Sequence, residues 1–446
     1  MIKERTKISE DIYNEMEEET KERKNDNVVR NSILNVGLDE IALNHKSKTE
    51  MLHTFSLELT TGKITSQNKS GRCWLFAGLN TMRFKIMKDL DLKNFELSQT
   101  YQMFFDKIEK ANYFLENILE TLNEETNSRL IMWLLSAPLN DGGQWDMFTS
   151  IVEKYGVVPK ETMPETFASS NSARMNHILT LKLRGYASTL REDYQNGETI
   201  EKLKIDKQKM VFEFYRLLTM FLGIPPKNFT FEYTNKDKKF HRDIDITPKE
   251  FYSKYVDIDL KDYISIINAP TKDKPFNKTF TVQYLGNVEG GNMVKYLNVG
   301  MKTFKKLALS QLKDGIPVWF GSDVGQKMKR ENGILDENIY DYENALQSKF
   351  NLDKADRLDY GESLMTHAMV FTGVNLVDDV PNRWKVENSW GDKNGKKGYF
   401  VMSDKWFEEY TYQIVINKKY LQKDLIKAWE LEPIILKPWD PMGSLA

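Results

Sequence analysis

The architecture of the chain is indicated by one octapeptide, Gln67-Asn68-Lys69-Ser70-Gly71-Arg72-Cys73-Trp74, which holds the only cysteine among its 446 residues. A glycine two residues before the cysteine permits a tight turn, and the sequence after Trp74 is strongly helical. A thiol at a helix N-terminus feels the positive end of the helix dipole, which favours the thiolate. The octapeptide therefore indicates a nucleophile; the alternative is a buried core cysteine, the more common place for a free thiol.

Two distant segments supply the partners that such a nucleophile requires. Thr366-His367-Ala368-Met369-Val370 predicts a strand entered by a histidine, and neutral imidazole is the usual base that converts a thiol to a thiolate. Glu387-Asn388-Ser389-Trp390-Gly391 places an asparagine at a strand end, where it can hydrogen-bond the imidazole beside a bulky indole. Cysteine, histidine and asparagine form a known arrangement of nucleophile, base and orienting group. The chain has 5 histidines, so few other bases are available.

These segments resemble the papain-type cysteine peptidases and, in finer detail, the bleomycin hydrolase and aminopeptidase C branch of that family. Gly71-Arg72-Cys73-Trp74 resembles the nucleophile signature of the branch. Two more blocks resemble it: Gly315-Ile316-Pro317-Val318-Trp319-Phe320-Gly321 and the final Lys437-Pro438-Trp439-Asp440-Pro441-Met442-Gly443-Ser444-Leu445-Ala446. Several independent blocks in the same order argue against coincidence.

The resemblance implies an α+β fold built on a papain-like two-lobed core, with a helical left lobe and a β-barrel-like right lobe. We expect five regions: an N-terminal helical or extended segment over 1–60, the left lobe over 61–164, a mostly helical insertion over 165–265, the right lobe over 266–430, and a C-terminal arm over 431–446 that lies in the active-site cleft.

Local patterns predict several elements within these regions. A helix beginning near Cys73 carries an apolar stripe at Leu75, Leu79, Met82, Ile86 and Leu90. Ser98 is a good N-cap for a second helix. Residues 279–285 alternate like a strand, and residues 394–398 form a plausible hairpin turn.

The resemblance also implies a role for each site residue. Cys73 attacks a peptide carbonyl, His367 transfers the proton, and Asn388 orients the imidazole. Gln67 and the Cys73 amide form the oxyanion hole, in which one donor is typically worth about 3–4 kcal/mol of barrier. Trp390 shields the His367–Asn388 hydrogen bond at the edge of the substrate site. The alternatives are a surface loop position for Gln67 and ordinary core packing for Trp390.

Substrate contacts are expected from a glycine pair and from the chain end. Gly142 and Gly143 resemble the pair with which papain-like enzymes bind substrate as an extended strand, because paired glycines allow close approach of two backbones; a simple turn is the alternative. The resemblance implies that the arm blocks the non-primed side and that the carboxylate of Ala446 faces the substrate's α-ammonium. The enzyme would then be an aminopeptidase acting on peptides with a free N-terminus.

Composition and charge limit the other classes of function. A net charge of −2 argues against a general nucleic-acid surface. The chain has no run of about 18 apolar residues and so no expected membrane span. Its start is no secretory signal, and Ser70 replaces a disulfide-forming cysteine of secreted relatives, so a cytoplasmic protein is expected. We expect no cofactor and no metal, since no two histidines lie at helical ligand spacing and Cys73 has no partner cysteine. The resemblance further implies a hexamer.

Three alternative functions stay open. An ordinary papain-like endopeptidase would cleave peptides with a blocked N-terminus. A broader amide hydrolase of drug-like or thiolactone substrates would use the same site. A nucleic-acid-binding ring would require a vestigial site, although the cysteine, histidine and asparagine are all present.

Overall fold

The computed structural model describes residues 7–23 and 26–445 and divides the chain into two compact units. The smaller unit comprises residues 1–50 and 337–351, and the larger comprises residues 51–336 and 352–446. The candidate site lies entirely in the larger unit.

The smaller unit is helical and includes a second segment, residues 337–351, from later in the chain. Its helices are α1 (Glu10–Glu22), α2 (Asp26–Val36), α3 (Leu38–Ala42), α4 (His45–Glu50) and α14 (Tyr342–Leu346). α2 ends before Gly37, whose φ of 87° is unfavourable for a residue with a Cβ. The Asp341 amide donates to the Ala42 carbonyl at 2.8 Å, and the Tyr342 hydroxyl donates to Asp39 at 2.8 Å, which fastens the second segment to α3.

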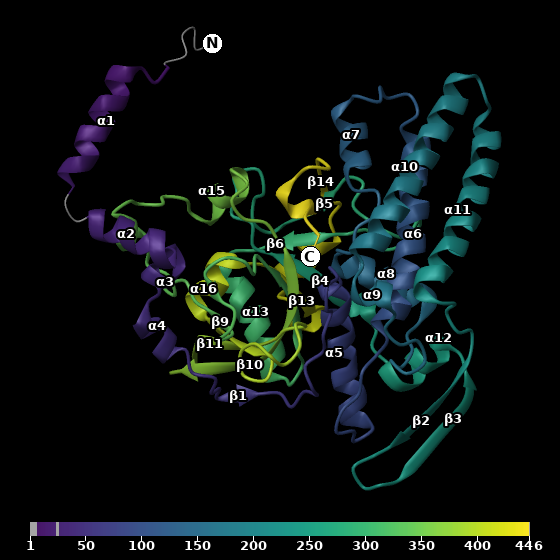
Figure 1. Cartoon of the computed structure of the whole chain (residues 1–446). Coiled ribbons are helices and arrows are strands. Elements are labelled where there is room, and N and C mark those ends of the chain that lie inside the picture. Colours follow the sequence, from purple (N-terminus) through teal and green to yellow (C-terminus); the bar gives the residue numbers. More distant parts are fainter. Residues whose placement is uncertain (1–6, 24–25, 446) are drawn as a thin grey trace. The chain divides into compact units, whose positions relative to one another are not determined.

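The first half of the larger unit is a helical lobe (Figure 1). Its main helices are α5 (Cys73–Asp89), α6 (Gln99–Glu120), α7 (Arg129–Ser136), α8 (Trp145–Tyr155), α9 (Phe167–Ser170), α10 (Ala173–Gln195) and α11 (Ile200–Leu222). The helix predicted from Cys73 is confirmed, and its apolar stripe is buried apart from Leu90, the half-buried C-cap. Ser98 caps α6 as predicted, because its Oγ accepts the Tyr101 amide at 3.0 Å.

The segment between this lobe and the sheet also contains strands. β2 (Phe229–Thr234) and β3 (Phe240–Ile246) form a separate two-stranded sheet, followed by α12 (Pro248–Phe251). Phe231 packs edge-on against Phe251, with ring centroids 4.9 Å apart. The hairpin is therefore held to the helical part by aromatic packing.

The second half, together with β1 from the start of the larger unit, forms one mixed sheet of 12 strands in the order β14-β5-β6-β4-β13-β7-β10-β11-β12-β9-β8, with β1 paired to β10. The strands are β1 (Leu57–Glu58), β4 (Tyr263–Ile267), β5 (Lys278–Val282), β6 (Tyr296–Asn298), β7 (Val318–Ser322), β8 (Met328–Lys329), β9 (Ile334–Leu335), β10 (His367–Val377), β11 (Val380–Glu387), β12 (Tyr399–Ser403), β13 (Thr411–Asn417) and β14 (Ile434–Leu436). Antiparallel pairing of β10 with β11 brings the start of one strand near the end of the other.

Helices pack against this sheet and complete its core. They are α13 (Met301–Lys313), α15 (Lys354–Asp359), α16 (Asp404–Tyr410) and α17 (Lys423–Glu430). One hydrophobic cluster lies between the sheet and α13, α16 and α17, and another surrounds α5, α6 and α8. The fold is thus α+β, as predicted. No helix in the described part of the chain is both long and apolar enough to span a membrane.

Two local predictions differ from the structure. The strand expected over 279–285 ends at Val282, because Tyr284 adopts a φ of 60°, which lies outside the strand region. Residues 394–398 do form a turn, with the Gly398 amide donating to the Asn394 carbonyl at 3.0 Å. It is no tight hairpin, however, since the connection between β11 and β12 extends over 388–398.

Candidate active site

The nucleophile candidate is fixed at the start of α5. Cys73 is the first residue of the helix and is 2% exposed. Arg72, immediately before it, forms a bidentate pair with Glu165 at 3.1 and 2.9 Å. Trp74, immediately after it, donates its indole N–H to the Asp141 carbonyl at 2.6 Å. Residues distant in sequence therefore hold both neighbours of the thiol.

The base candidate lies at the start of β10 and is oriented by a neutral partner. The Nε2 atom of His367 lies 2.9 Å from Oδ1 of Asn388. This oxygen can only accept, so Nε2 must carry the proton, and Nδ1 is left as the basic nitrogen. The same oxygen also accepts the Ser389 amide at 2.7 Å, which fixes the carboxamide. The Trp390 and His367 ring centroids lie 4.9 Å apart, so the indole covers the imidazole.

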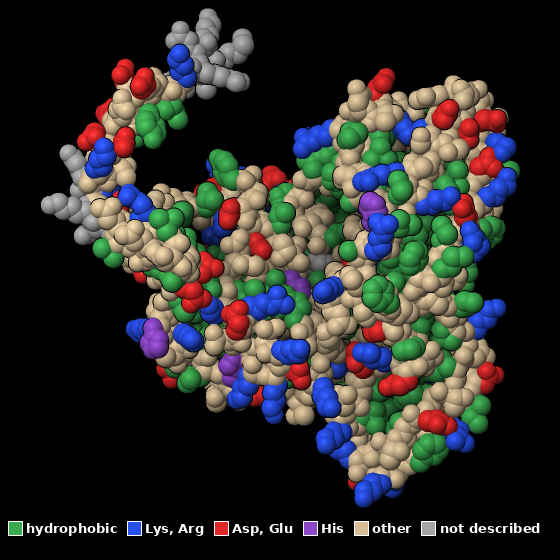
Figure 2. Space-filling view, viewed as in Figure 1, with side chains coloured by type: hydrophobic (Ala, Val, Ile, Leu, Met, Phe, Trp, Pro, Cys, Tyr) green, Lys and Arg blue, Asp and Glu red, His purple; other side chains and the backbone are tan. Residues whose placement is uncertain are grey.

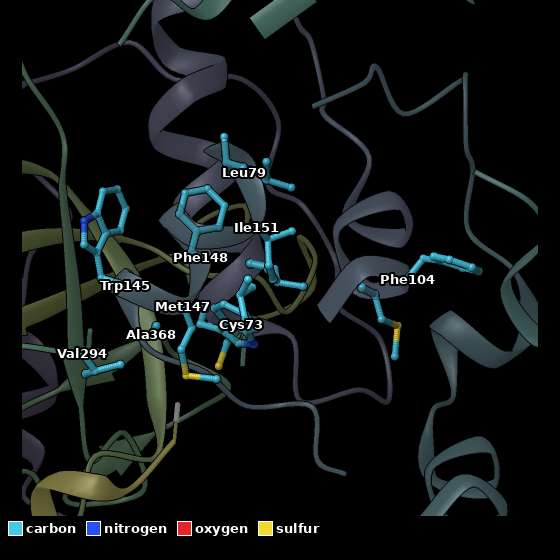
Figure 3. Close-up of a cluster of buried hydrophobic side chains, with 14 of the residues drawn as sticks. Cys73, Leu79, Phe104, Trp145, Met147, Phe148, Ile151, Val294 and Ala368 are labelled. Atoms are coloured by element: carbon cyan, nitrogen blue, oxygen red, sulfur yellow. The ribbon is translucent and has the colours of Figure 1, made fainter. Parts of the chain in front are cut away.

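The beginning of β10 brings the thiol and the imidazole into one place. The backbone amide of Ala368, the residue after His367, points to the Cys73 sulfur and offsets part of the rise that burial causes in the pKa of the thiol. Figure 3 shows Cys73, Ala368 and Met147 within the same cluster of buried side chains. The segments that carry Cys73 and His367 thus meet at the Ala368 amide, and Asn388 contacts the imidazole.

Burial dominates the ionisation of both reacting groups. It raises the pKa of Cys73 to about 11, although the amides of Ala368, Trp74 and Cys73 act in the opposite direction. It lowers the pKa of His367 to about 4, against the effect of the Asn388 hydrogen bond. Forming the Cys73 thiolate alone or the His367 imidazolium alone is therefore unfavourable in this buried site. Proton transfer from thiol to imidazole instead creates two opposite charges, whose attraction offsets part of that cost.

Gln67 is held at both ends of its carboxamide. Its Oε1 accepts the Ser389 hydroxyl at 2.6 Å, and its Nε2 donates to the Ser70 carbonyl at 2.6 Å. The amide nitrogen has two hydrogens, so one is left for another acceptor. Ser389 was not among the predicted site residues. Its place directly after Asn388 is the signal that could have identified it.

Asp141 is a second residue that the sequence interpretation missed. Its carboxylate accepts the Gly71 amide at 3.0 Å and the Lys107 ammonium at 2.7 Å, and it also binds Ser172 and Asn176. Although burial opposes ionisation, Lys107 and these hydrogen bonds hold the pKa of Asp141 well below its usual range. Asp141 therefore connects the turn before the nucleophile to the glycine pair that follows it.

The two glycines occupy different environments. A Cβ on Gly143 would lie 2.6 Å from the Trp74 indole, so a larger residue would displace the ring. The Gly142 carbonyl accepts the Lys110 ammonium at 2.6 Å, and Gly142 lines a cavity of about 400 Å³. Gly143 thus packs beneath the neighbour of the nucleophile, whereas Gly142 borders open space.

The C-terminal arm lies between the glycine pair and the entry to β10. The Ser444 carbonyl accepts a hydrogen bond from the side-chain Nε2 of Gln144 at 2.6 Å, and the Ser444 hydroxyl donates to the Met365 carbonyl at 2.8 Å. Further back, Arg129 lies 3.8 Å above the Trp439 ring. Ala446, predicted to face the substrate's ammonium, lies outside the described residues.

Within residues 7–23 and 26–445, no group of three or more His, Cys, Asp or Glu side chains is placed to hold a metal ion.

Comparison with known proteins extends over almost the whole chain. Residues 7–443 match the Peptidase C1-like family. Aminopeptidase C of Listeria innocua is 55% identical over 441 residues, covering 99% of each chain. Bleomycin hydrolase of Homo sapiens is 44% identical over 391 residues, covering 86% of each. The crystal structure of PepW from Lactobacillus rhamnosis superposes with a TM-score of 0.97 at 50% identity, covering 99% of this chain and 100% of that one.

Proposed function

The chain belongs to the Peptidase C1-like family and is a papain-like cysteine aminopeptidase, and we propose that Cys73, His367, Asn388 and Gln67 are its catalytic residues. The observation that carries this assignment is the 2.9 Å contact between His367 Nε2 and Asn388 Oδ1. It leaves Nδ1 of the imidazole as the base for the thiol.

The proposed reaction has two stages. The Cys73 thiol passes its proton to His367, and the sulfur attacks the carbonyl carbon of the first peptide bond. The free N–H of Gln67 and the Cys73 amide stabilise the oxyanion. The imidazolium protonates the departing amine and leaves a thioester. A water molecule, deprotonated by the imidazole, then releases the N-terminal residue as an acid and restores the thiol.

Trp390 is proposed to protect this arrangement at the edge of the substrate site. Its ring covers His367 and is itself covered by Arg330, whose guanidinium lies 4.5 Å from the ring centroid. Exclusion of water strengthens the hydrogen bond between imidazole and carboxamide.

The test of the activity compares free and blocked N-termini. We expect hydrolysis of a fluorogenic leucine amide with a free amino group and no hydrolysis of its N-acetylated form. Efficient cleavage of internal bonds in blocked peptides would instead favour the endopeptidase alternative.

The arm is proposed to restrict the enzyme to N-terminal residues. The contacts of Ser444 with the Gln144 side chain and the Met365 carbonyl support this role, because they fix the arm between the glycine pair and the entry to β10, the region in which we propose that substrate binds. Deletion of residues 443–446 should allow cleavage of N-blocked peptides. Ser444→Ala keeps the chain length and should stay an aminopeptidase. A truncated enzyme that still cleaves only free N-termini would contradict the proposal.

The assembly and location are also proposals. We propose a cytoplasmic homohexamer that takes peptides with a free N-terminus and has no nucleic-acid partner. Exposed apolar side chains on α10 and α11, including Leu181, Phe212 and Met220, support self-association. Charges of both signs are interspersed over the face in Figure 2, which argues against a nucleic-acid surface. A sedimentation mass near the 52.2 kDa of one chain would contradict the hexamer.

A further inference from the structure

The cavity beside Gly142 has aromatic walls. It measures about 400 Å³ and lies between α6, α7 and the segment after β5. Tyr113 and Phe114 of α6, Trp133 of α7 and Tyr284 contribute rings to its lining. A space of this size accommodates one large amino-acid side chain, and aromatic walls favour an apolar occupant.

Lys110 links the cavity to the catalytic residues. Its ammonium holds the carbonyl of Gly142 at 2.6 Å and lies 5.3 Å from the ring centroid of Trp74, the residue after the nucleophile. Met147, which shares a buried cluster with Cys73, also lines the cavity. A substrate residue that is bonded at Cys73 and runs along Gly142 therefore has this cavity within reach of its side chain.

The arm borders the same cavity from the other side. Gly443 and Leu445 belong to its lining, next to the contact between Ser444 and Gln144. The arm thus takes up part of the space beside Gly142. This arrangement matches an N-terminal residue, which has nothing before it.

The described residues that line the cavity offer no free partner to an ionised side chain. None of the described residues that line it carries a carboxylate, so an incoming ammonium or guanidinium finds no counter-ion in its lining. Lys110, the one cation among the described lining residues, is already paired with Asp106 at 2.8 Å and bound to Gly142, so it is not free to receive a carboxylate. Burial of an unpaired charge is costly in either case.

We propose that this cavity receives the side chain of the substrate's N-terminal residue and selects bulky, uncharged residues such as phenylalanine, leucine and methionine. The inference rests on the aminopeptidase function proposed above. It adds a preference that follows from this chain's own lining residues.

The first test is a panel of fluorogenic amino-acid amides with N-terminal Phe, Leu, Ala, Lys and Glu. We expect kcat/KM for Phe and Leu to exceed that for Ala, Lys and Glu by about tenfold or more. A preference for Lys or Glu, or equal values across the panel, would overturn the inference while leaving the aminopeptidase function intact. No hydrolysis of any member would overturn the function itself.

Substitutions at Ala137 test whether this cavity is responsible. Ala137 is an exposed lining residue at the end of α7, so a larger side chain can enter the cavity without disrupting the core. Ala137→Trp should lower kcat/KM for Phe about tenfold and change that for Ala less than about twofold. Ala137→Glu should raise the Lys-to-Phe ratio about tenfold by supplying a counter-ion.

Met132→Trp is the matched control, because Met132 lies on the same helix and is 55% exposed but does not line this cavity. It should leave the preference unchanged. The inference would be overturned if Ala137→Trp lowered kcat/KM equally for all substrates. It would also be overturned if Met132→Trp changed the substrate preference as much as Ala137→Trp.

Discussion

The surroundings of Cys73 and of His367 are held by different chemistry. The surroundings of the nucleophile are held by ion pairs in which the cation is fully buried and the carboxylate is partly buried. These pairs are Arg72 with Glu165 at 2.9 Å and Lys107 with Asp141 at 2.7 Å. Around the base the contacts are uncharged hydrogen bonds that lead from His367 through Asn388 and Ser389 to Gln67. Ion pairs give strong, directional anchoring, whereas neutral partners leave the charge state of the imidazole free to change during the reaction.

One ion pair joins these two regions. Arg83 of α5 contacts Glu387, the residue before Asn388, at 2.6 Å, and both side chains are 2% exposed. Arg83 also donates to the Lys63 carbonyl at 2.9 Å, so its guanidinium is well satisfied. The helix that carries the thiol is thereby fixed to the end of β11, directly before the orienting carboxamide of Asn388.

The largest effect is expected at the nucleophile. Cys73→Ala should reduce kcat/KM by at least about a thousandfold, because no other thiol can form the thioester. The unfolding midpoint should change little, since the substitution removes one buried sulfur. Steady-state kinetics and thermal unfolding measure the two quantities; substantial residual turnover would remove the covalent mechanism.

The next effect is on stability, at the link between the two regions. Arg83→Met leaves the buried Glu387 unpaired and should lower the free energy of unfolding by about 3–5 kcal/mol. The double variant Arg83→Met with Glu387→Met should recover most of this loss. Lys85→Met is the control, because its pair with Asp89 is exposed and should be worth less than about 1 kcal/mol. Urea unfolding that gave equal losses for Arg83→Met and Lys85→Met would contradict a structural role for the buried pair.

A charged orienting group should move the ionisation of the base. Asn388→Asp places a carboxylate against Nε2, which favours the imidazolium and raises the pKa of His367 above about 4. The acid limb of the pH dependence of kcat/KM should therefore move to higher pH. In the parent enzyme His367 takes up a proton at a higher pH in the unfolded state than in the folded state. The free energy of unfolding should therefore fall as pH decreases from about 6.5 to 4. That loss should be smaller in the variant, and an unchanged acid limb would contradict the assignment of the base.

The smallest effect is expected at Ser389. Ser389→Ala removes the hydrogen bond to Oε1 of Gln67 and should lower stability by about 1 kcal/mol. It should reduce kcat several-fold with little change in KM, because a less firmly oriented Gln67 stabilises the oxyanion less well. Kinetics in which KM rose and kcat did not change would place Ser389 in substrate binding instead.

The sequence identified those parts of the site that local chemistry reveals. Cys73 was recognisable from the turn and helix around it, and Ser98 from its capping position, because both signals lie within a few residues. The fold class followed from the resemblance to the papain-like family that these motifs carry. The supporting partners were not predictable in the same way. Asp141 and Glu387 are charged residues of ordinary appearance, and their roles depend on contacts made across the fold.

Irregular backbone conformations and long-range strand pairings were also not predictable from sequence patterns. Tyr284 has a φ of 60° that a run of alternating residues does not predict, and it ends β5 early. β14 joins the sheet beside β5 although the two strands are separated by most of the right lobe. Such pairings are set by tertiary packing, which outweighs local strand preference.

The convergence of Cys73 and His367 is tested most directly by the rate at which a thiol-directed epoxide alkylates Cys73, measured by mass spectrometry in the parent enzyme and in His367→Ala. With the imidazole accepting the proton, we expect alkylation at about pH 6 to be on the order of a hundredfold faster in the parent enzyme than in the variant. Equal rates in the two proteins would show that the imidazole does not activate this sulfur.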